Sequence, residues 1–230
     1  MPNQWIMLKA DDLRFDPDHI ISPNWKRFID YIVSQDIKAG LGIIGASLEE
    51  GDDRYFDLVR DLHQSGRFEI WNHGYNHHLE RTNEAGETYH ELQNTPYGYQ
   101  KAHLLKTQTL ARGKLDITLR SFGAPGNKKD AHTLRAVDET DEIEVWLYGD
   151  DASSKRVLKR YANIEFPAHE PDYQKFLKSY PPNREYLLLQ GHPNGWDDRK
   201  FGQFDLMIQY LKQQGCQFIN PYEYHLRHAQ

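Results

Sequence analysis

The chain has only one cysteine, Cys216, among its 230 residues. One thiol cannot form an intrachain disulfide or supply a cluster of thiolate ligands, so disulfide stapling and thiolate zinc sites are excluded. The sequence also lacks any apolar run near the roughly 20 residues that span a bilayer. Its first residues lack the basic flank and apolar stretch of a secretion signal. We therefore expect a soluble, cytoplasmic protein without a transmembrane segment.

Basic residues are in the minority, since 28 Lys and Arg face 34 Asp and Glu and give a formal charge of -6. Without a dense basic tract to hold a phosphate backbone, nucleic acid is not an expected partner. Hydrophobic residues make up 38% of the chain and aromatic residues 13%, which is enough to pack a core. We expect one globular domain over residues 1–230. Histidine stands out, with 12 copies, because imidazole and carboxylate groups together form metal sites.

Short apolar runs alternate with amphipathic stretches along the chain, a pattern typical of repeated βα units. The expected strands are Trp5–Ala10, Ala39–Ala46, Phe68–Asn72, Leu119–Ala124, Glu144–Tyr148, Tyr161–Phe166, Tyr186–Gln190 and Cys216–Ile219. The expected helices are Asn24–Ser34, Arg54–His63, Tyr99–Ala111, Ala131–Asp138, Tyr173–Ser179 and Phe204–Gln213. This order predicts a compact (β/α) barrel or a doubly wound open sheet. The segment Thr82–Gly98 has no clear period, and we expect it to form a loop over the site.

Polar side chains gather where four of these expected strands end. Asp11 and Asp12 follow the first strand, and a histidine-rich segment at residues 71–78 follows the third. The turn segment Gly123–Asn127 comes at the end of the fourth, and His192 follows the seventh. Because catalytic groups collect at the carboxyl ends of the strands in both architectures, we expect these side chains to share one rim.

The spacing of His73 and His77 places both imidazoles on the same side of one helical turn, where they can hold a divalent ion. A solvated, histidine-rich turn is the alternative. A metal site would need one carboxylate from Asp11 and Asp12 as a ligand and could leave the other free as a general base. The alternative for this acidic pair is a helix or turn cap.

Two further positions allow both a structural and a catalytic interpretation. The Phe122–Asn127 segment has the composition of a tight turn, but a glycine amide there, such as that of Gly126, could donate to a developing oxyanion. His192 could be a structural histidine, although its place on the expected rim favours a general acid.

Taken in order, these segments resemble the motifs of the polysaccharide deacetylase family, the NodB-homology group of carbohydrate esterases. Lys9–Leu13 is similar to the first motif, His73–His77 to the second, Phe122–Asn127 to the third and Leu189–His192 to the fifth. The resemblance implies a distorted (β/α) barrel of seven or eight strands. It also implies hydrolysis with one divalent metal ion, with Zn favoured and Co, Ni or Mn as alternatives.

The resemblance assigns roles to individual residues. The implied metal ligands are Asp12, His73 and His77. Asp11 is the implied general base, His192 the implied general acid, and a backbone amide near Gly126 the implied oxyanion donor. Trp146 is the implied aromatic of the fourth motif at the substrate site.

This sequence departs from the family pattern at two motifs. The third motif normally has an Arg that steadies the catalytic Asp, but Gly123 stands at that position. Lys9 could replace it, since it lies two residues from Asp11 on the same strand face; a lysine that reaches solvent at the barrel rim is the alternative. The fourth motif is only loosely recognisable around Trp146, with Asp150 and Asp151 after it.

The leading hypothesis is a metal-dependent amide hydrolase that removes an N-acyl group, acetyl or formyl, from an amino sugar or a sugar-containing precursor. Its expected partner is thus a carbohydrate or another small molecule. One alternative keeps the fold and changes the substrate to a cyclic imide or ureide, as in allantoinase-like relatives. Another is a carbohydrate-binding relative without catalysis, for which the missing Arg at Gly123 is the motive.

Overall fold

The computed structural model describes residues 4–228 and is built around one main sheet of eight strands. The strands are β1 (Trp5–Leu13), β2 (Ala39–Ile43), β3 (Phe68–Asn72), β6 (Ser121–Phe122), β7 (Val145–Leu147), β8 (Arg156–Leu158), β9 (Tyr186–Gly191) and β10 (Gln217–Phe218). The order runs from β8 through β7, β6, β3 and β2 to β1, which also pairs with β9 and β10. Every pairing in this sheet is parallel.

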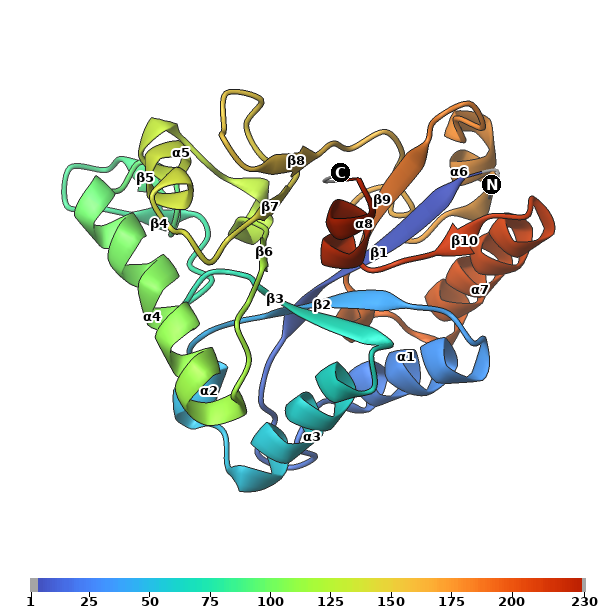
Figure 1. The fold of residues 1–230 in the computed structure, drawn as a ribbon, viewed down its shortest axis with the longest axis horizontal. Coiled ribbons are helices and arrows are strands. Elements are labelled where there is room, and N and C mark those ends of the chain that lie inside the picture. The colour runs from blue at the N-terminus through green and yellow to red at the C-terminus, as the bar shows by residue number, and fades with distance from the viewer. Residues whose placement is uncertain (1–3, 229–230) are drawn as a thin grey trace.

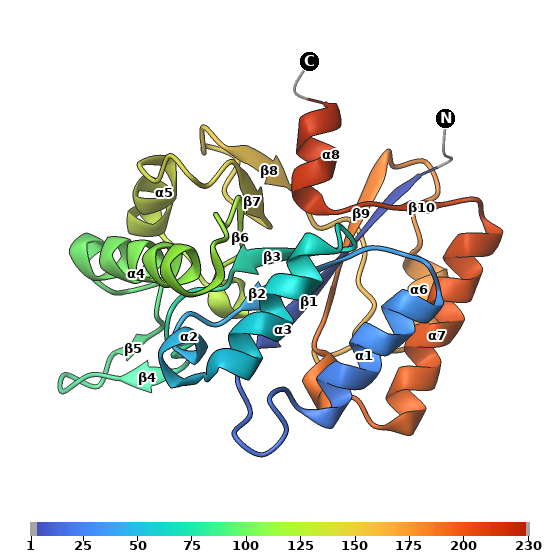
Figure 2. The same ribbon diagram turned by 60° about the horizontal axis from the view of Figure 1, so that its bottom comes forward.

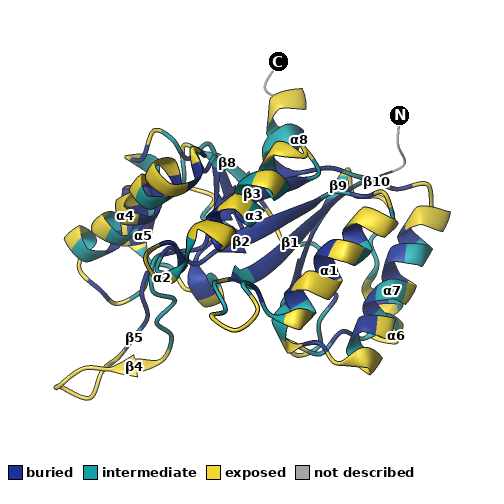
Figure 3. Cartoon of the chain, turned by 90° about the horizontal axis from the view of Figure 1, so that it is seen from below, coloured by how far each residue is buried: buried dark blue, intermediate teal, exposed yellow. Residues whose placement is uncertain are grey.

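Helices connect the strands, as parallel pairing requires. They are α1 (Pro23–Ser34), α2 (Ser47–Glu50), α3 (Asp53–Gln64), α4 (Tyr97–Leu115), α5 (Ala131–Asp138), α6 (Tyr173–Ser179), α7 (Asp198–Gln213) and α8 (Pro221–Arg227). Figure 1 shows most of them arranged around the outside of the curved sheet. Their inward faces are buried and their outward faces exposed, while β2 and β3 are buried throughout (Figure 3). Buried parallel strands explain why these runs read as almost continuously apolar in the sequence.

The expected distorted (β/α) barrel of seven or eight strands is confirmed. The sheet curls without a strand pairing between β8 and β9 in the part of the chain that the structure describes. Within residues 4–228, no helix is both long and apolar enough to cross a bilayer. Figure 2 shows α8 at one end of the sheet, and the antiparallel hairpin of β4 (Arg81–Thr82) and β5 (Thr88–Tyr89) at the other.

The expected strand at Tyr161–Phe166 is wrong, because the strand in this region is β8, a few residues earlier. Ala162 and Ile164 are buried, whereas Tyr161, Asn163 and Glu165 are only partly so. This alternation imitates a strand in the sequence, but burying alternate side chains does not require a hydrogen-bonded ladder. The segment instead runs beside the sheet and brings Glu165 to the site described below.

The remaining differences concern short or irregular elements. Helices α2 and α8 were not expected; α2 has four residues, too few to show a helical period in the sequence, and α8 has seven. The expected loop at Thr82–Gly98 contains part of the β4–β5 hairpin, and α4 begins at Tyr97. The residues after the hairpin turn inward, since Glu91 and Leu92 are buried.

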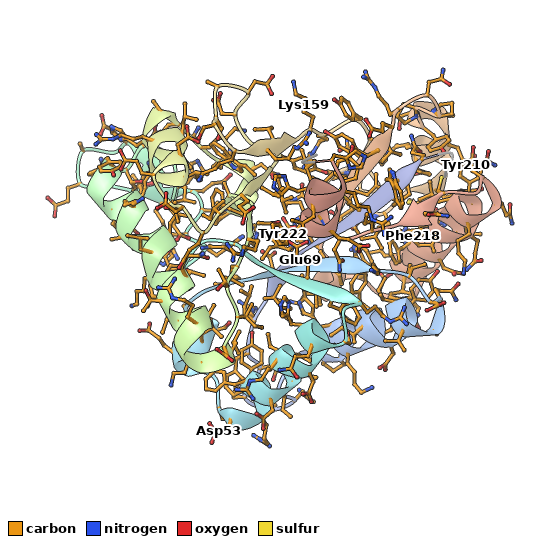
Figure 4. The ribbon with its side chains drawn as sticks, viewed as in Figure 1. Asp53, Glu69, Lys159, Tyr210, Phe218 and Tyr222 are labelled. Carbon is orange, nitrogen blue, oxygen red and sulfur yellow. The ribbon has the colours of Figure 1, made fainter. Side chains whose placement is uncertain are left out.

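A buried carboxyl group connects β3, β6 and α8 at one end of the sheet. Glu69, on β3, accepts hydrogen bonds from the Ser121 hydroxyl and from the Tyr222 backbone N–H, the latter at 2.8 Å. Figure 4 shows Glu69 and Tyr222 near each other beside α8. Burial raises the pKa of Glu69 to about 7, although these two hydrogen bonds oppose the shift.

We predict that Glu69→Gln stabilises the protein increasingly as the pH rises. The folded protein keeps the Glu69 proton up to about pH 7, whereas an unperturbed carboxyl loses it near pH 4.5. The folded state therefore binds more protons in this window, and wild-type stability falls through it. The amide does not titrate, so the difference in unfolding free energy should reach about 3 kcal/mol above pH 7. Urea unfolding at pH 5 and pH 8 measures it, with the exposed Glu84→Gln as control; equal differences at both pH values would contradict the prediction.

Candidate active site

The ends of β1 and β3 bring together one carboxylate and two imidazoles. The Asp12 Oδ1 atom lies 3.2 Å from His73 Nε2 and 2.9 Å from His77 Nε2. The pairing of β1 with β2 shifts register between Ala10 and Leu13, and Asp12 has a φ of 74°. This irregularity frees Asp12 from the alternation of the strand, so that it and the adjacent Asp11 both reach the site.

These three residues fit a divalent metal ion. One ligand atom from each lies within 4.8 Å of the others. Asp12 Oδ1 and His73 Nε2 are buried, yet neither has a hydrogen-bond partner in the described residues. The other ring nitrogen of His73 lies 2.7 Å from the Gly123 carbonyl oxygen, which orients the ring with Nε2 toward Asp12. Two imidazoles and one carboxylate are a ligand set typical of first-row divalent ions.

Glu91 fixes the segment that carries His77. Its carboxylate is completely buried and accepts hydrogen bonds from the backbone N–H groups of Tyr75, Asn76 and His77, the last at 2.6 Å. His103 Nδ1 lies 3.0 Å from the same carboxylate. The backbone of His77 lies in the left-handed region, with a φ of 54°. Sequence analysis missed Glu91 because it lies in the segment expected to be an irregular loop.

We predict that Glu91→Gln weakens metal binding by about 10- to 100-fold, the range typical of residues that orient metal ligands. An amide has only one acceptor oxygen and directs N–H groups at the backbone donors, so His77 should lose its fixed position. Calorimetric titration with Zn or Co measures the change. Glu87→Gln, an exposed substitution in the preceding β4–β5 hairpin, is the control; an unchanged affinity in Glu91→Gln would show that the segment holds its shape without this carboxylate.

Lys9 and Asp11 form an ion pair below the three potential ligands. The Lys9 Nζ atom lies 2.7 Å and 2.6 Å from the two Asp11 carboxylate oxygens, and the Gln190 amide donates to Asp11 Oδ2 at 2.7 Å. Both charged side chains are at most 1% exposed. Burial lowers the pKa of Lys9, although the charge of Asp11 opposes this shift. Asp11 Oδ2 remains 3.6 Å from His73 Nε2, close to the ligand set.

Lys9 lies where the sequence analysis expected a replacement for the missing Arg, and the alternative of a solvent-reaching lysine is wrong. A Cβ atom on Gly123 would lie 2.9 Å from the Trp71 ring and 3.0 Å from Lys9 Cε. The ammonium group also lies 4.7 Å from the centre of the Trp71 ring. A side chain at residue 123 would therefore require Trp71 or Lys9 to shift, so Gly123 leaves room for the lysine.

We predict that Lys9→Met destabilises the protein by about 3–5 kcal/mol, because it leaves the buried Asp11 charge without its partner. Asp11→Asn in the same chain should restore part of the loss, since it removes the unpaired charge. Urea unfolding of the two single variants and the double variant measures the coupling. Additive effects would mean that the ion pair between Lys9 and Asp11 contributes no coupling energy to stability.

His192 has an acidic partner that the sequence analysis did not find. Its backbone N–H donates to Glu165 Oε1 at 2.8 Å, and its Nδ1 lies 2.6 Å from Glu165 Oε2. Burial lowers the pKa of His192, but the hydrogen bond with Glu165 and the charge of Asp11 outweigh it and raise the pKa. The Trp196 indole donates to the same carboxylate at 2.8 Å. His192 Nε2 is thereby directed toward Asp11, whose Oδ2 lies 3.9 Å away.

The placement of the fourth motif around Trp146 is corrected by this geometry. Trp146 is completely buried and packs against Phe122, with ring centres 6.0 Å apart, so it cannot contact a substrate. Asp150 accepts a hydrogen bond from the Ala152 backbone, and Asp151 pairs with Lys159. Glu165 directly follows the buried Ile164. Because we predicted a strand over this segment, we did not recognise Glu165 as a candidate site residue.

Gly126 lies at the edge of the same site. It is exposed, has a φ of 57°, and lines a pocket of about 190 Å³ together with Gln190 and His192. A Cβ atom there would lie 3.0 Å from Leu79. The site residues expected from the sequence therefore meet at one end of the sheet, with the exception of Trp146.

Comparison with known proteins agrees with this geometry. Residues 2–142 match the family model described as polysaccharide deacetylase. The chain belongs to the polysaccharide deacetylase family. The family and fold implied by the sequence motifs are thus confirmed. None of the curated proteins compared with the chain matches it.

Solved structures of carbohydrate esterase family 4 share the fold. An acetyl xylan esterase from Clostridium thermocellum, solved with a cobalt ion, is 16% identical over 94% of this chain and 88% of its own, with a TM-score of 0.65. An esterase from Streptomyces lividans, solved with acetate, is 13% identical over 95% and 93%, with a TM-score of 0.61. A pseudoenzyme from Bacillus anthracis is 16% identical over 97% and 66%, with a TM-score of 0.67. Because esterases and a pseudoenzyme share this fold, the activity must be argued from the site.

Proposed function

We propose that this protein is a metal-dependent hydrolase that removes an N-acyl group, acetyl or formyl, from an amino sugar or a sugar-containing precursor. The observation that carries the proposal is the position of Asp11. Its Oδ2 atom lies 3.6 Å from the His73 nitrogen of the ligand set and 3.9 Å from His192 Nε2. A potential base thus lies between the metal ligands and a potential acid, as hydrolysis of an amide requires. The solved relatives with a cobalt ion and with acetate support the same chemistry.

The chain's own residues supply the remaining groups of the mechanism. Asp12, His73 and His77 would hold the ion, for which Zn fits best and Co, Ni or Mn are alternatives. Such an ion, when bound, supplies Lewis acidity and lowers the pKa of a water molecule. Asp11 accepts a proton from the attacking water; its carboxylate has a lone pair left beyond the bonds from Lys9 and Gln190.

His192 acts on the opposite side of the reaction. Its Nδ1 is engaged with Glu165, so a proton on Nε2 can pass to the departing amine nitrogen. The raised pKa of His192 favours the protonated form that this step needs. The backbone N–H of Gly126, a residue that is itself exposed, would donate to the oxyanion as the carbonyl becomes tetrahedral.

The compartment is also part of the proposal. Cys216 is a free, buried thiol, which suits a reducing environment. We propose a cytoplasmic location, where N-acylated sugar precursors or lipid-linked intermediates are more accessible substrates than assembled polymers.

The experiment is to measure acetate and formate release from N-acylated sugars and sugar nucleotides, using metal-stripped protein before and after addition of Zn, Co, Ni or Mn. Release that depends on the metal would support the proposal and identify the acyl group. Stoichiometric metal with no release from any sugar, but turnover of cyclic imides or ureides, would favour the allantoinase-like alternative. Sugar binding without turnover of either class would favour a non-catalytic relative.

Two variants separate metal binding from catalysis, and we predict opposite patterns for them. His73→Ala should lose most bound metal and with it the activity. Asp11→Asn should retain the metal but lower turnover by at least about 100-fold, as expected for loss of a general base. Metal analysis of purified protein and acyl release provide the two readouts, with the exposed His132→Ala as control. Full metal occupancy in His73→Ala would refute the ligand assignment.

A further inference from the structure

The pocket of about 190 Å³ beside His192 is distinct in composition from the space around the metal ligands. Arg160, Asn127 and Asn163 line it, together with Gln190 and Glu165. A second pocket, of about 280 Å³, is lined by Asp12 and His77. The two pockets share no lining residue.

Arg160 brings a positive charge to the first pocket without a carboxylate to balance it. Its guanidinium donates to the Gln190 side-chain oxygen and stacks 4.2 Å from the centre of the Tyr148 ring. In the described part of the chain, no carboxylate forms an ion pair with it. Arg160 is itself exposed, so its remaining N–H groups are available to a ligand.

The one acidic residue of this pocket is already occupied. Both oxygens of Glu165 accept hydrogen bonds: Oε1 from the His192 backbone and Trp196, and Oε2 from the His169 backbone and the His192 ring. Gln190 is fixed as well, because it donates to Asp11 and accepts from Asn127 at 3.0 Å. The pocket thus presents a guanidinium and side-chain amides on a rigid support.

The position of His192 decides which part of a substrate enters this pocket. In the proposed reaction His192 gives a proton to the departing amine, so the amine-bearing half of the substrate lies on its side. The carbonyl then lies between Gly126 at the edge of this pocket and the metal ligands, and the rest of the acyl group lies toward Asp12 and His77. A ligand group that meets Arg160 therefore belongs to the amine product and not to the released acid.

We infer that the amine-bearing half of the substrate carries an anionic group, a carboxylate or a phosphate, that binds to Arg160 in this pocket. The inference rests on the proposed hydrolase function and narrows its substrate class to acidic or phosphorylated amino sugars. A planar guanidinium binds both anions through paired hydrogen bonds. Asn127 and Asn163 supply amides for the hydroxyl groups of the same sugar.

The test compares three substrates that differ at one position: N-acetylglucosamine, its 6-phosphate, and N-acetylglucosaminuronic acid. If formate proves to be the released acid, the N-formyl counterparts replace them. The wild type should favour one anionic member over the neutral sugar in kcat/KM by about 10- to 100-fold, as expected for a hydrogen-bonded charge. The preferred anionic member shows whether the pocket suits a phosphate or a carboxylate.

Variants then locate the source of this preference. Arg160→Gln should bring the anionic-to-neutral ratio of kcat/KM close to one, mainly through KM, and Arg160→Lys should keep part of it. Arg14→Gln removes an exposed cation that lines the second pocket and should leave the ratio as in the wild type. An equal ratio in wild type and Arg160→Gln, or a loss of preference only in Arg14→Gln, would overturn the inference.

A binding measurement separates this inference from the hydrolase proposal. Calorimetry with the amine products, glucosamine and glucosamine 6-phosphate or glucosaminuronic acid, needs no turnover. Tighter binding of an acidic product that depends on Arg160, with no hydrolysis of any N-acyl sugar, would support the anion site and refute the hydrolase. Hydrolysis of neutral and anionic sugars at the same rate, with equal product affinities, would refute the anion site alone.

Discussion

The buried ion pair between Lys9 and Asp11 is the constraint around which the end of the sheet is organised. Burying a charge on a carboxylate that is only 1% exposed is costly unless a cation or several donors compensate it. Lys9 provides the cation from the same strand, two residues away, and needs space in the barrel interior. Gly123 provides part of this space, and Gly42 accommodates the Trp71 ring that covers the lysine, since a Cβ at Gly42 would lie 2.3 Å from that ring. The need to compensate the buried charge of Asp11 therefore accounts for Lys9, Gly42 and Gly123.

The segments that carry His77 and His192 have one feature in common: each is held by an acid from outside the segment. Glu91 binds the backbone around His77, and Glu165 binds the backbone and ring of His192. Both carboxylates are at most 5% exposed. Each carboxylate therefore uses its hydrogen bonds to fix the position of a histidine. This arrangement is the support that precise ligand and acid positions require.

The sequence was informative where chemistry and strand periodicity coincide. Asp11, Asp12, His73 and His77 follow clear apolar runs, so their meeting at one end of the sheet could be predicted. Glu91 and Glu165 could not, because their roles depend on contacts across the fold. The prediction of a substrate role for Trp146 was wrong because an aromatic residue beside a strand end can face the core as easily as the site. The mistaken strand at Tyr161–Phe166 had a similar origin, since burial alternated there without a ladder.

The distribution of charge explains why this site can bind a cation although it already contains several basic groups. Asp11 has Lys9, Glu165 has His192, and Glu91 has three backbone N–H groups and His103. Asp12 differs, because it faces only His73 and His77, and its Oδ1 has no hydrogen-bond partner in the described residues. Imidazole is itself a metal ligand when neutral, so these neighbours do not compete with a divalent ion but bind it with Asp12. Asp11, Glu91 and Glu165 thus have partners within the protein. Asp12 lies between two imidazoles, where a metal ion would bind its Oδ1 atom together with His73 and His77.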